Sequence, residues 1–444
     1  MSRTLHDRLA DLAEEAQPVP DPGDAWDRGR RWQRDRRRGT IAVSLAAALV
    51  LVVLLGTSWL RSHPSVEPAS GLGEPALPDH VWAPGAWLPG TGAEPAGPVA
   101  VLVGAERGGW LGGAPGVVGV SALDGSYRFL DLPGLTAEVG SPALSPDGAH
   151  VAYWTTGSTT ESPRTASGPV TGVAVYDTVS GDVRRHDIPT AHGLDPELLT
   201  WVDATTLALG SGQYRGGDDD PDADQDVVEP GTLQVWRLSD ERPRTVPGLD
   251  PARVVGAAPR GLLLGDRSRA RLWALDGEGG VRRTTAVARA GEDTCEPPVV
   301  DPGASRFAFV SAGRAAGGSS CPGTVAIATT GSPVELLPST AGTLQVLGWV
   351  DEAVAVLRLP SPRRDAAVVD LAPLDGGAPS RVLAVDEDVV GGGVQVATDL
   401  LGSPTRRGAE PPTPVDPRVV WGGVAAVLVA ALLAVRAWRR RAVR

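Results

Sequence analysis

The sequence predicts an all-β fold, a six-bladed β-propeller between two transmembrane α-helices, with a seven-bladed ring as the alternative. The first observation is compositional: the 444 residues include 56 glycines and 40 prolines, yet 42% of residues are apolar. Apolar residues in short clusters between turn residues indicate many short strands. The second observation is a repeat of four such clusters along the chain. The third is a long uncharged run near each end, each beside a group of arginines.

The repeat is clearest between Ser141 and Pro189. SPALSPDGAHVAYW contains a short strand, a turn at Pro146-Asp147-Gly148 and a second strand, and VTGVAVYDTVSGDVRRHDIP contains a third strand, a turn and a fourth. Four short antiparallel strands form one propeller blade, which cannot bury both of its faces alone. This segment therefore predicts one blade of a larger ring.

The expected domains follow from these signals in chain order. They are a cytoplasmic tail with a short amphipathic helix and an arginine collar (1–39), a transmembrane helix (40–60), a linker and domain start (61–97), the extracytoplasmic propeller (98–402), a Pro-rich linker (403–417), a second transmembrane helix (418–438) and a cytoplasmic basic tail (439–444).

The N-terminal tail places Leu5, Leu9, Leu12 and Ala16 at helical spacing before a Pro-rich break. A helix of about four turns is marginal alone and is stabilised mainly by packing on something else. Two interpretations stay open: residues 1–25 are a solvated tail, or they dock on a cytoplasmic partner.

Both uncharged runs are long enough to cross a bilayer. Residues 40–60 lack any charge, which gives about 30 Å of helix, and the run from Val419 to Val435 is at the short end of the useful range. Arginines precede the first run and follow the second, and basic residues mark the cytoplasmic side. We therefore expect a plasma-membrane protein with both termini in the cytoplasm and the propeller outside it.

Between the linkers the repeat recurs with variation. Thr200-Trp201-Val202-Asp203 matches Gly348-Trp349-Val350-Asp351, and Val300-Asp301-Pro302-Gly303 echoes Ser145-Pro146-Asp147-Gly148. The segment from Val389 to Leu401 closes the ring by pairing with an early strand, or combines with Val81 to Leu88 as a seventh blade. The six expected blades are 98–132, 141–189, 195–247, 252–288, 295–338 and 344–385.

These motifs carry a family resemblance. LSPDGAHVAYW resembles the PD-type repeat of TolB-like propellers, and VAVYDTVSG is similar to the third strand of WD-repeat proteins. The resemblance covers roughly residues 98 to 400 and implies a propeller that binds partners through its surface. All 41 basic residues are Arg, which we interpret as the codon bias of a high-GC bacterium.

Few residues are candidates for a specific site. Cys295 and Cys321 are expected to form a disulfide in an extracytoplasmic domain, with two unpaired thiols as the alternative. The carboxylates Asp220, Asp222, Asp224 and Asp226 alternate as in a calcium loop. However, Gln225 stands where an EF-hand needs Gly, and Gly231 stands where it needs Glu. We therefore expect a solvated acidic insertion, no metal and no cofactor.

Other side chains have structural roles in this interpretation. The six histidines are scattered and are expected to be polar surface residues. The tryptophans at or beside strand positions are expected to pack between blades; they are Trp154, Trp201, Trp236, Trp273 and Trp349.

Catalytic and nucleic-acid-binding functions are not expected. The chain lacks a G-x-S-x-G elbow and any alternation of strands with helices, so we expect no enzyme. The net charge is −12 and arginine clusters only beside the membrane runs, which argues against nucleic-acid binding.

Two functions remain. The first is a membrane-tethered, extracytoplasmic, non-catalytic scaffold or sensor that binds an envelope protein or a glycan. The alternative is a transmembrane signal transducer, because the N-terminal layout is similar to that of bacterial transmembrane anti-sigma regulators. Residues 1–39 hold one His and no Cys, so the zinc site of some of those regulators cannot be carried over.

Overall fold

The structure, a computed structural model, describes most of the chain from residue 73 to residue 442. The described ranges are 73–92, 94–136, 141–163, 168–215, 228–258, 261–266, 269–275, 281–289, 298–315, 318–329, 332–360, 366–390, 393–412 and 416–442. The chain divides into two compact units. One spans Pro68–Pro414, and the other combines Met1–Glu67 with Val415–Arg444.

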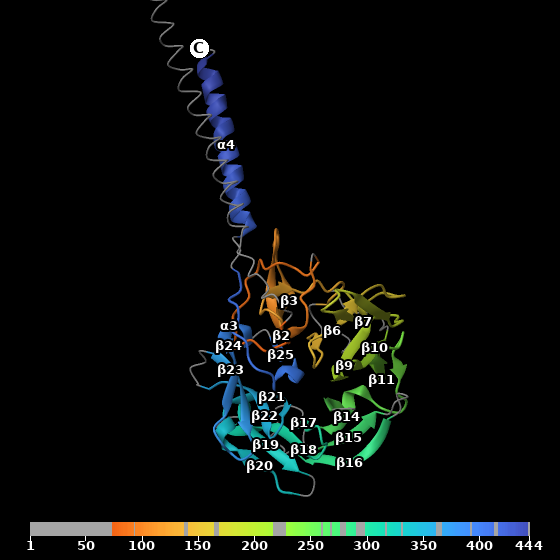
Figure 1. Cartoon of the computed structure of the whole chain (residues 1–444). Coiled ribbons are helices and arrows are strands. Elements are labelled where there is room, and N and C mark those ends of the chain that lie inside the picture. The colour runs from red at the N-terminus through yellow and green to blue at the C-terminus, as the bar shows by residue number, and fades with distance from the viewer. Residues whose placement is uncertain are drawn as a thin grey trace, which may run out of the picture. The chain divides into compact units, whose positions relative to one another are not determined.

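The larger unit is built from antiparallel sheets, so the prediction of a mainly β domain is confirmed (Figure 1). The first sheet has the order β25 (Val394–Val396), β2 (Val99–Gly109), β3 (Gly112–Ser121), β4 (Tyr127–Phe129). The second has the order β5 (Ala143–Leu144), β6 (His150–Thr156), β7 (Val170–Asp177), β8 (Val183–Asp187). The third has the order β9 (Leu194–Asp203), β10 (Thr206–Tyr214), β11 (Val228–Arg237), β12 (Arg244–Thr245).

The remaining strands form a fourth sheet and one wider sheet. The fourth has the order β13 (Val254–Ala258), β14 (Gly261–Asp266), β15 (Arg269–Leu275), β16 (Val281–Arg289). The wider sheet contains two such four-stranded groups, joined only where Gly323 of β19 pairs with Thr343 of β21. The groups are β17 (Val299–Val300), β18 (Arg306–Ala315), β19 (Gly318–Thr329), β20 (Glu335–Leu337), and β21 (Thr343–Val350), β22 (Ala353–Arg358), β23 (Ala366–Pro373), β24 (Ser380–Asp386).

Short helices fill some of the connections. They are η1 (Pro251–Arg253), η2 (Pro338–Thr340), η3 (Thr398–Leu400) and α3 (Glu387–Val390). Within the second sheet, β7 is buried along almost its whole length, whereas most of β8 is exposed. The fourth strand of this meander therefore lies at the outer edge, and its polar side chains (VRRHD) suit that position.

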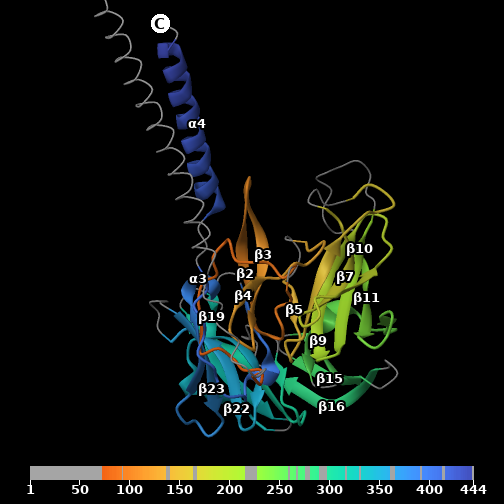
Figure 2. The same ribbon diagram turned by 45° about the horizontal axis from the view of Figure 1, so that its top comes forward.

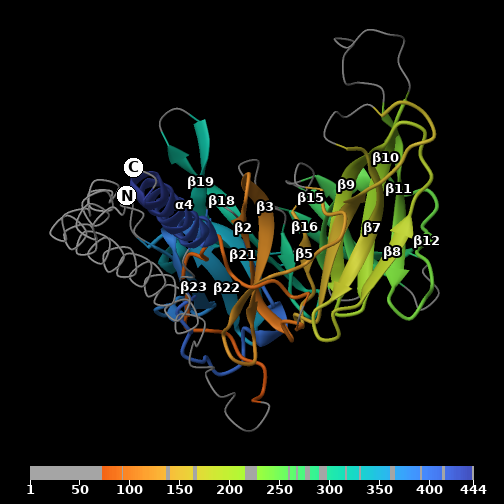
Figure 3. The same ribbon diagram turned by 90° about the horizontal axis from the view of Figure 1, so that it is seen from above.

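Apolar side chains of each group share a core with the next group. Trp154 of β6 clusters with Trp236 of β11, and Leu233 of β11 clusters with Leu262 of β14. The series continues with Leu263 and Phe307, then with Val310 and Val354. Val385 of β24 shares the largest cluster with Val101 of β2, so the packing returns to the first sheet. Figure 3 shows β2 and β3 between the last group and the second sheet.

The C-terminal end of the domain completes the first sheet. β25 pairs with β2 in antiparallel fashion, with Val396 opposite Val101. This confirms that the segment from Val389 to Leu401 pairs with an early strand. β1 (His80–Val81) instead pairs in parallel with β24. Within the described ranges, the two segments that a seventh blade would have combined therefore belong to different sheets.

A long apolar helix follows the domain. α4 spans Pro417–Ala442, and its stretch Pro417–Ala437 is long and apolar enough to cross a membrane, with a mean hydropathy of 2.2. The helix extends past the expected end at residue 438. The expected tail 1–39, the expected first span 40–60 and linker residues 61–72 lie outside the described residues.

Candidate interaction site

The candidate residues expected from the sequence cannot be assembled into a site. Asp220, Asp222, Asp224 and Asp226 lie outside the described residues, as does Cys295. Cys321 lies in β19, and its side chain is not described. The disulfide and the acidic loop therefore stay predictions.

Two of the five strand tryptophans join neighbouring four-stranded groups by hydrogen bonds. The Trp201 indole Nε1–H donates to the carbonyl oxygen of Ala143 (2.8 Å), which links β9 to β5. The Trp349 indole donates in the same way to Val299 (3.0 Å), which links β21 to β17. The expected packing between neighbouring groups is confirmed for all five: Trp154, Trp201 and Trp236 share one core cluster, and Trp273 and Trp349 pack against two others. These two hydrogen bonds were not expected from the sequence. The repeated W-V-D motif, which contains both tryptophans, is the sequence feature that could have indicated them.

The turns facing these tryptophans are also repeated. Ser145 Oγ accepts the backbone N–H of His150 (2.9 Å), and Asp301 Oδ1 accepts that of Arg306 (2.7 Å). The residue after each turn then lies against a tryptophan: the His150 ring is 5.8 Å from Trp201 and the Arg306 guanidinium is 5.1 Å from Trp349. The two turn motifs, which the sequence shows as similar, therefore also make similar side-chain contacts: each turn accepts a backbone N–H, and the residue after it lies against a tryptophan.

Three of the histidines are partly buried and have charged neighbours. His80 pairs with Asp386 at 3.0 Å, and the His192 side chain, 14% exposed, pairs with Glu161 at 3.2 Å. His186 is half-buried, and burial together with Arg242 lowers its pKa. Spacing in the sequence cannot reveal such partners, because they come from other parts of the chain.

The hairpin of β2 and β3 is the most distinctive surface feature of the described residues. It extends beyond the rest of the first sheet (Figure 2). Near the tip end of β2, Arg107 pairs with Asp131 at 2.6 Å and lies 5.3 Å from the Phe129 ring. The second carboxylate oxygen of Asp131 accepts the N–H of Gly92 (2.6 Å). These contacts hold the distal part of the hairpin against the loop that precedes it.

A second contact holds the distal part of the hairpin one residue further along β2. The N–H of Gly108 donates to the carbonyl of Ala86 (2.6 Å). The Trp87 indole packs so closely on Gly108 that a Cβ there would lie 2.6 Å from the ring. Only glycine allows this approach without a shift of the indole.

The tip of the hairpin is apolar and exposed. Trp110 is 62% exposed and Leu111 is fully exposed, and they occupy the turn between β2 and β3. From Gly108 to Val117 the sequence GGWLGGAPGV contains no charged residue. An exposed apolar tip beside a firmly held end of the strand pair is typical of a contact site.

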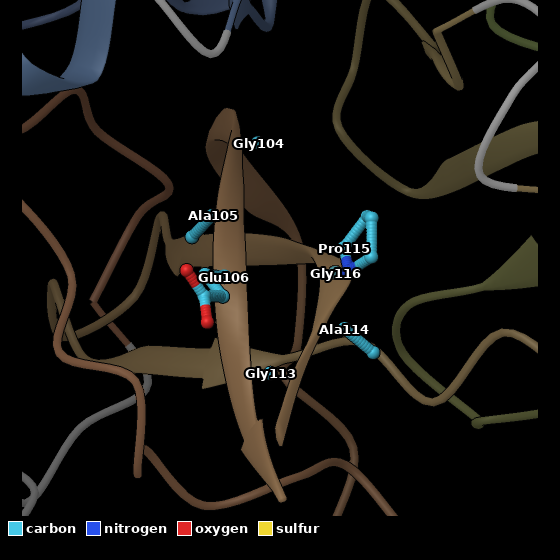
Figure 4. A pocket seen from close by; sticks show the side chains of 7 residues that line it. All are labelled: Gly104, Ala105, Glu106, Gly113, Ala114, Pro115 and Gly116. Atoms are coloured by element: carbon cyan, nitrogen blue, oxygen red, sulfur yellow. The ribbon is translucent and has the colours of Figure 1, made fainter.

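A shallow hollow of about 480 Å³ lies on the same hairpin (Figure 4). Its lining residues are Gly104, Ala105, Glu106, Gly113, Ala114, Pro115 and Gly116. Glu106 is the one ionisable side chain among them. A single carboxylate with small apolar neighbours can accept hydrogen bonds but provides no nucleophile with a base.

In the described part of the chain, no group of three or more His, Cys, Asp or Glu side chains could hold a metal ion. Burial raises the pKa of Tyr127 to about 12, and its hydroxyl oxygen accepts the N–H of Trp82 (3.0 Å). This tyrosine serves packing between the N-terminal segment and β4.

Comparison with known proteins gives no family. No protein-family model matches the chain, and no curated protein matches its sequence. A functionally unknown protein from Desulfotomaculum acetoxidans DSM 771 is 13% identical with a TM-score of 0.36, covering 65% of this chain and 80% of that one. An acylaminoacyl peptidase from Pyrococcus horikoshii is 11% identical with a TM-score of 0.37, covering 64% of this chain and 44% of the peptidase. AtxE2 isopeptidase is 14% identical with a TM-score of 0.31, covering 69% of this chain and 51% of the isopeptidase. This chain spans about half the length of the two peptidases, and similarity at this level assigns no function.

Proposed function

We propose that residues 98–402 form a six-bladed β-propeller that acts outside the cytoplasm as a non-catalytic binding scaffold or sensor, tethered to the plasma membrane. The observation that supports this most is the cyclic series of shared cores, closed by β25 on β2. Six four-stranded meanders that each pack on the next are typical of a propeller. The C-terminal strand in the first sheet is one way to close such a ring.

The tether rests on α4 and on the expected span at residues 40–60. A 21-residue apolar stretch gives about 30 Å of helix, which matches the hydrocarbon thickness of a bilayer. Arg439, Arg440 and Arg441 follow this stretch and favour a cytoplasmic C-terminus. Two spans with both termini inside place the propeller outside.

Orientation is tested by labelling in intact cells. Leu336→Cys places a thiol on exposed β20, and a cysteine added after Arg444 places one at the C-terminus. We expect an impermeant maleimide to label Leu336→Cys on intact cells, and to label the added cysteine only after permeabilisation. The unsubstituted chain gives the background from Cys295 and Cys321. Labelling of the C-terminal cysteine on intact cells contradicts the orientation.

The binding function is tested by cross-linking in cells. The full-length chain is compared with a version lacking residues 1–25. A scaffold captures the same envelope protein or glycan with both versions. Capture of a cytoplasmic regulator by the full-length chain alone instead supports the signal transducer, whose expected docking residues lie outside the described ranges.

A further inference from the structure

We propose that the tip of the β2–β3 hairpin, Trp110 with Leu111, inserts into the lipid headgroup region of the membrane to which the chain is anchored. This inference rests on the proposed membrane tether. It adds a second membrane contact, made by the β domain itself.

The first argument follows the chain out of the domain. Near its C-terminal end, the N–H of Gly408 donates to Asp79 Oδ1 (2.7 Å). The carbonyl oxygen of Pro412 then lies 3.8 Å from the position of a Cβ on Gly85. Residues 413 to 416 alone separate Pro412 from the helix that starts at Pro417, so chain length keeps the two within about 18 Å. Gly85 therefore lies close to the point where the chain meets the membrane.

The second argument connects that point to the hairpin. Ala86, next to Gly85, accepts the N–H of Gly108 in β2. Trp110 lies two residues beyond Gly108, in the turn that follows β2, which adds at most about 7 Å. The hairpin thus rises from the same part of the domain surface from which the chain leaves for α4.

The third argument is chemical. Leu111 is fully exposed and Trp110 is 62% exposed, and the hairpin from Gly108 to Val117 carries no charge that would oppose insertion. Trp82 and Trp87 are half-buried in the segment beside Pro412. Tryptophan is enriched at membrane–water interfaces, where its ring is apolar and its N–H reaches water. This part of the surface combines three of the thirteen tryptophans with a well-held protruding strand pair.

A lipid surface fits this tip better than a protein partner does. A stable protein interface buries at least about 1,000 Å² in total, whereas one aromatic and one aliphatic side chain supply only a few hundred. A membrane contact needs no more than that, because the anchoring helix already holds the domain beside the bilayer.

The test uses the full chain in membranes of the expressing cells. The photoreactive residue p-benzoyl-phenylalanine replaces Leu111, Leu336 or Leu428 one at a time. Leu336 is 54% exposed on β20 and is the matched control, and Leu428 is 52% exposed on α4 and reports on the anchor itself. After irradiation, mass spectrometry identifies the adducts on each peptide.

We expect lipid adducts at positions 111 and 428 and none above background at position 336. Lipid adducts at 428 with none at 111 overturn the hairpin proposal and leave the tether standing. Adducts of position 111 with a protein also overturn it. Absence of lipid adducts at both 428 and 111 overturns the tether and the hairpin proposal together. A second experiment places p-benzoyl-phenylalanine at Ala114 instead. Replacing Trp110 and Leu111 together by Ser should then lower the lipid adducts at position 114 to the level of the position-336 control.

Discussion

The indole N–H of Trp201 donates a 2.8 Å hydrogen bond to the carbonyl oxygen of Ala143, across the boundary between two sheets. Ala143 lies in the first strand of one meander and Trp201 in the first strand of the next. Trp349 repeats this relationship with Val299. One side chain therefore fills the space between sheets and also satisfies a main-chain acceptor, which adds direction to non-directional packing.

Replacing Trp201 by Phe should keep most of the packing and lose this hydrogen bond. We expect the free energy of unfolding to fall by about 1–2 kcal/mol, because the carbonyl of Ala143 loses its partner. Trp349→Phe should lower the free energy of unfolding by a similar amount. The two losses should add, because the two tryptophans join different pairs of four-stranded groups. Urea unfolding of the full chain in detergent measures both. Trp110→Phe, on the exposed tip, is the control and should leave stability unchanged.

The turns before β6 and β18 have glycine and alanine at equivalent positions, so exchanging these two residues gives a pair of opposite substitutions to compare. Gly148 has φ +73°, and a Cβ there would lie 2.1 Å from the carbonyl oxygen of Val99, so Gly148→Ala should lower stability by more than about 2 kcal/mol. Ala304 occupies the equivalent position with φ 55°. Ala304→Gly should change stability by less than about 1 kcal/mol, because relief of strain offsets the greater entropy of glycine in the unfolded chain. Equal effects in thermal unfolding would contradict the steric argument.

Much of this architecture could be predicted because it depends on local signals. The turn at Pro146-Asp147-Gly148 and the apolar run at Val173–Tyr176 both reappear as a turn and a strand. These two features depend on residues close together in the sequence. The pairing of Val396 with Val101 joins distant segments; it was one of two alternatives that the sequence left open, and the fold decides between them.

The candidate site could not be predicted in the same way. The position of the hairpin tip depends on Arg107 meeting Asp131 and on Trp87 covering Gly108, and these contacts join different segments. In the sequence, Trp110-Leu111 is a short apolar pair between glycines, with no periodicity to show exposure. Its significance comes from being exposed on a strand pair beside Pro412, which only the fold shows.

Closure of the first sheet depends on one glutamine as well as on strand pairing. Gln395 Oε1 accepts the N–H of Leu144 (2.8 Å), and its Nε2–H donates to the carbonyl of Pro142. Gln395→Ala removes both bonds between β25 and β5 and should cost about 2 kcal/mol. Hydrogen exchange at Val394–Val396 should accelerate while that of β7 stays unchanged. Gln213→Ala, which removes a longer exposed bond to Pro189 (3.4 Å), is the matched control. Unchanged exchange in β25 would show that its backbone pairing alone closes the sheet.

Tyr127 should make the domain sensitive to alkali. Its side chain is buried, and burial raises its pKa from 10.0 to about 12. Between these pH values the folded state holds a proton that the unfolded state releases, so stability falls as pH rises, by up to about 1.4 kcal/mol per pH unit for this group. Tyr127→Phe loses the hydrogen bond from Trp82, which should cost about 1 kcal/mol at pH 8, but it removes this titration.

Because this titration costs more than the about 1 kcal/mol lost with the hydrogen bond, the stability curves of the two proteins should converge above pH 10 and cross before pH 12, measured by urea unfolding at each pH. Tyr153, whose pKa burial also raises to about 12, is present in both proteins and leaves a common slope. Tyr153→Phe in the Tyr127→Phe background should flatten that remaining slope. Parallel curves for the original chain and Tyr127→Phe would mean that the Tyr127 phenol titrates alike in the folded and unfolded states, and that burial does not hold its proton.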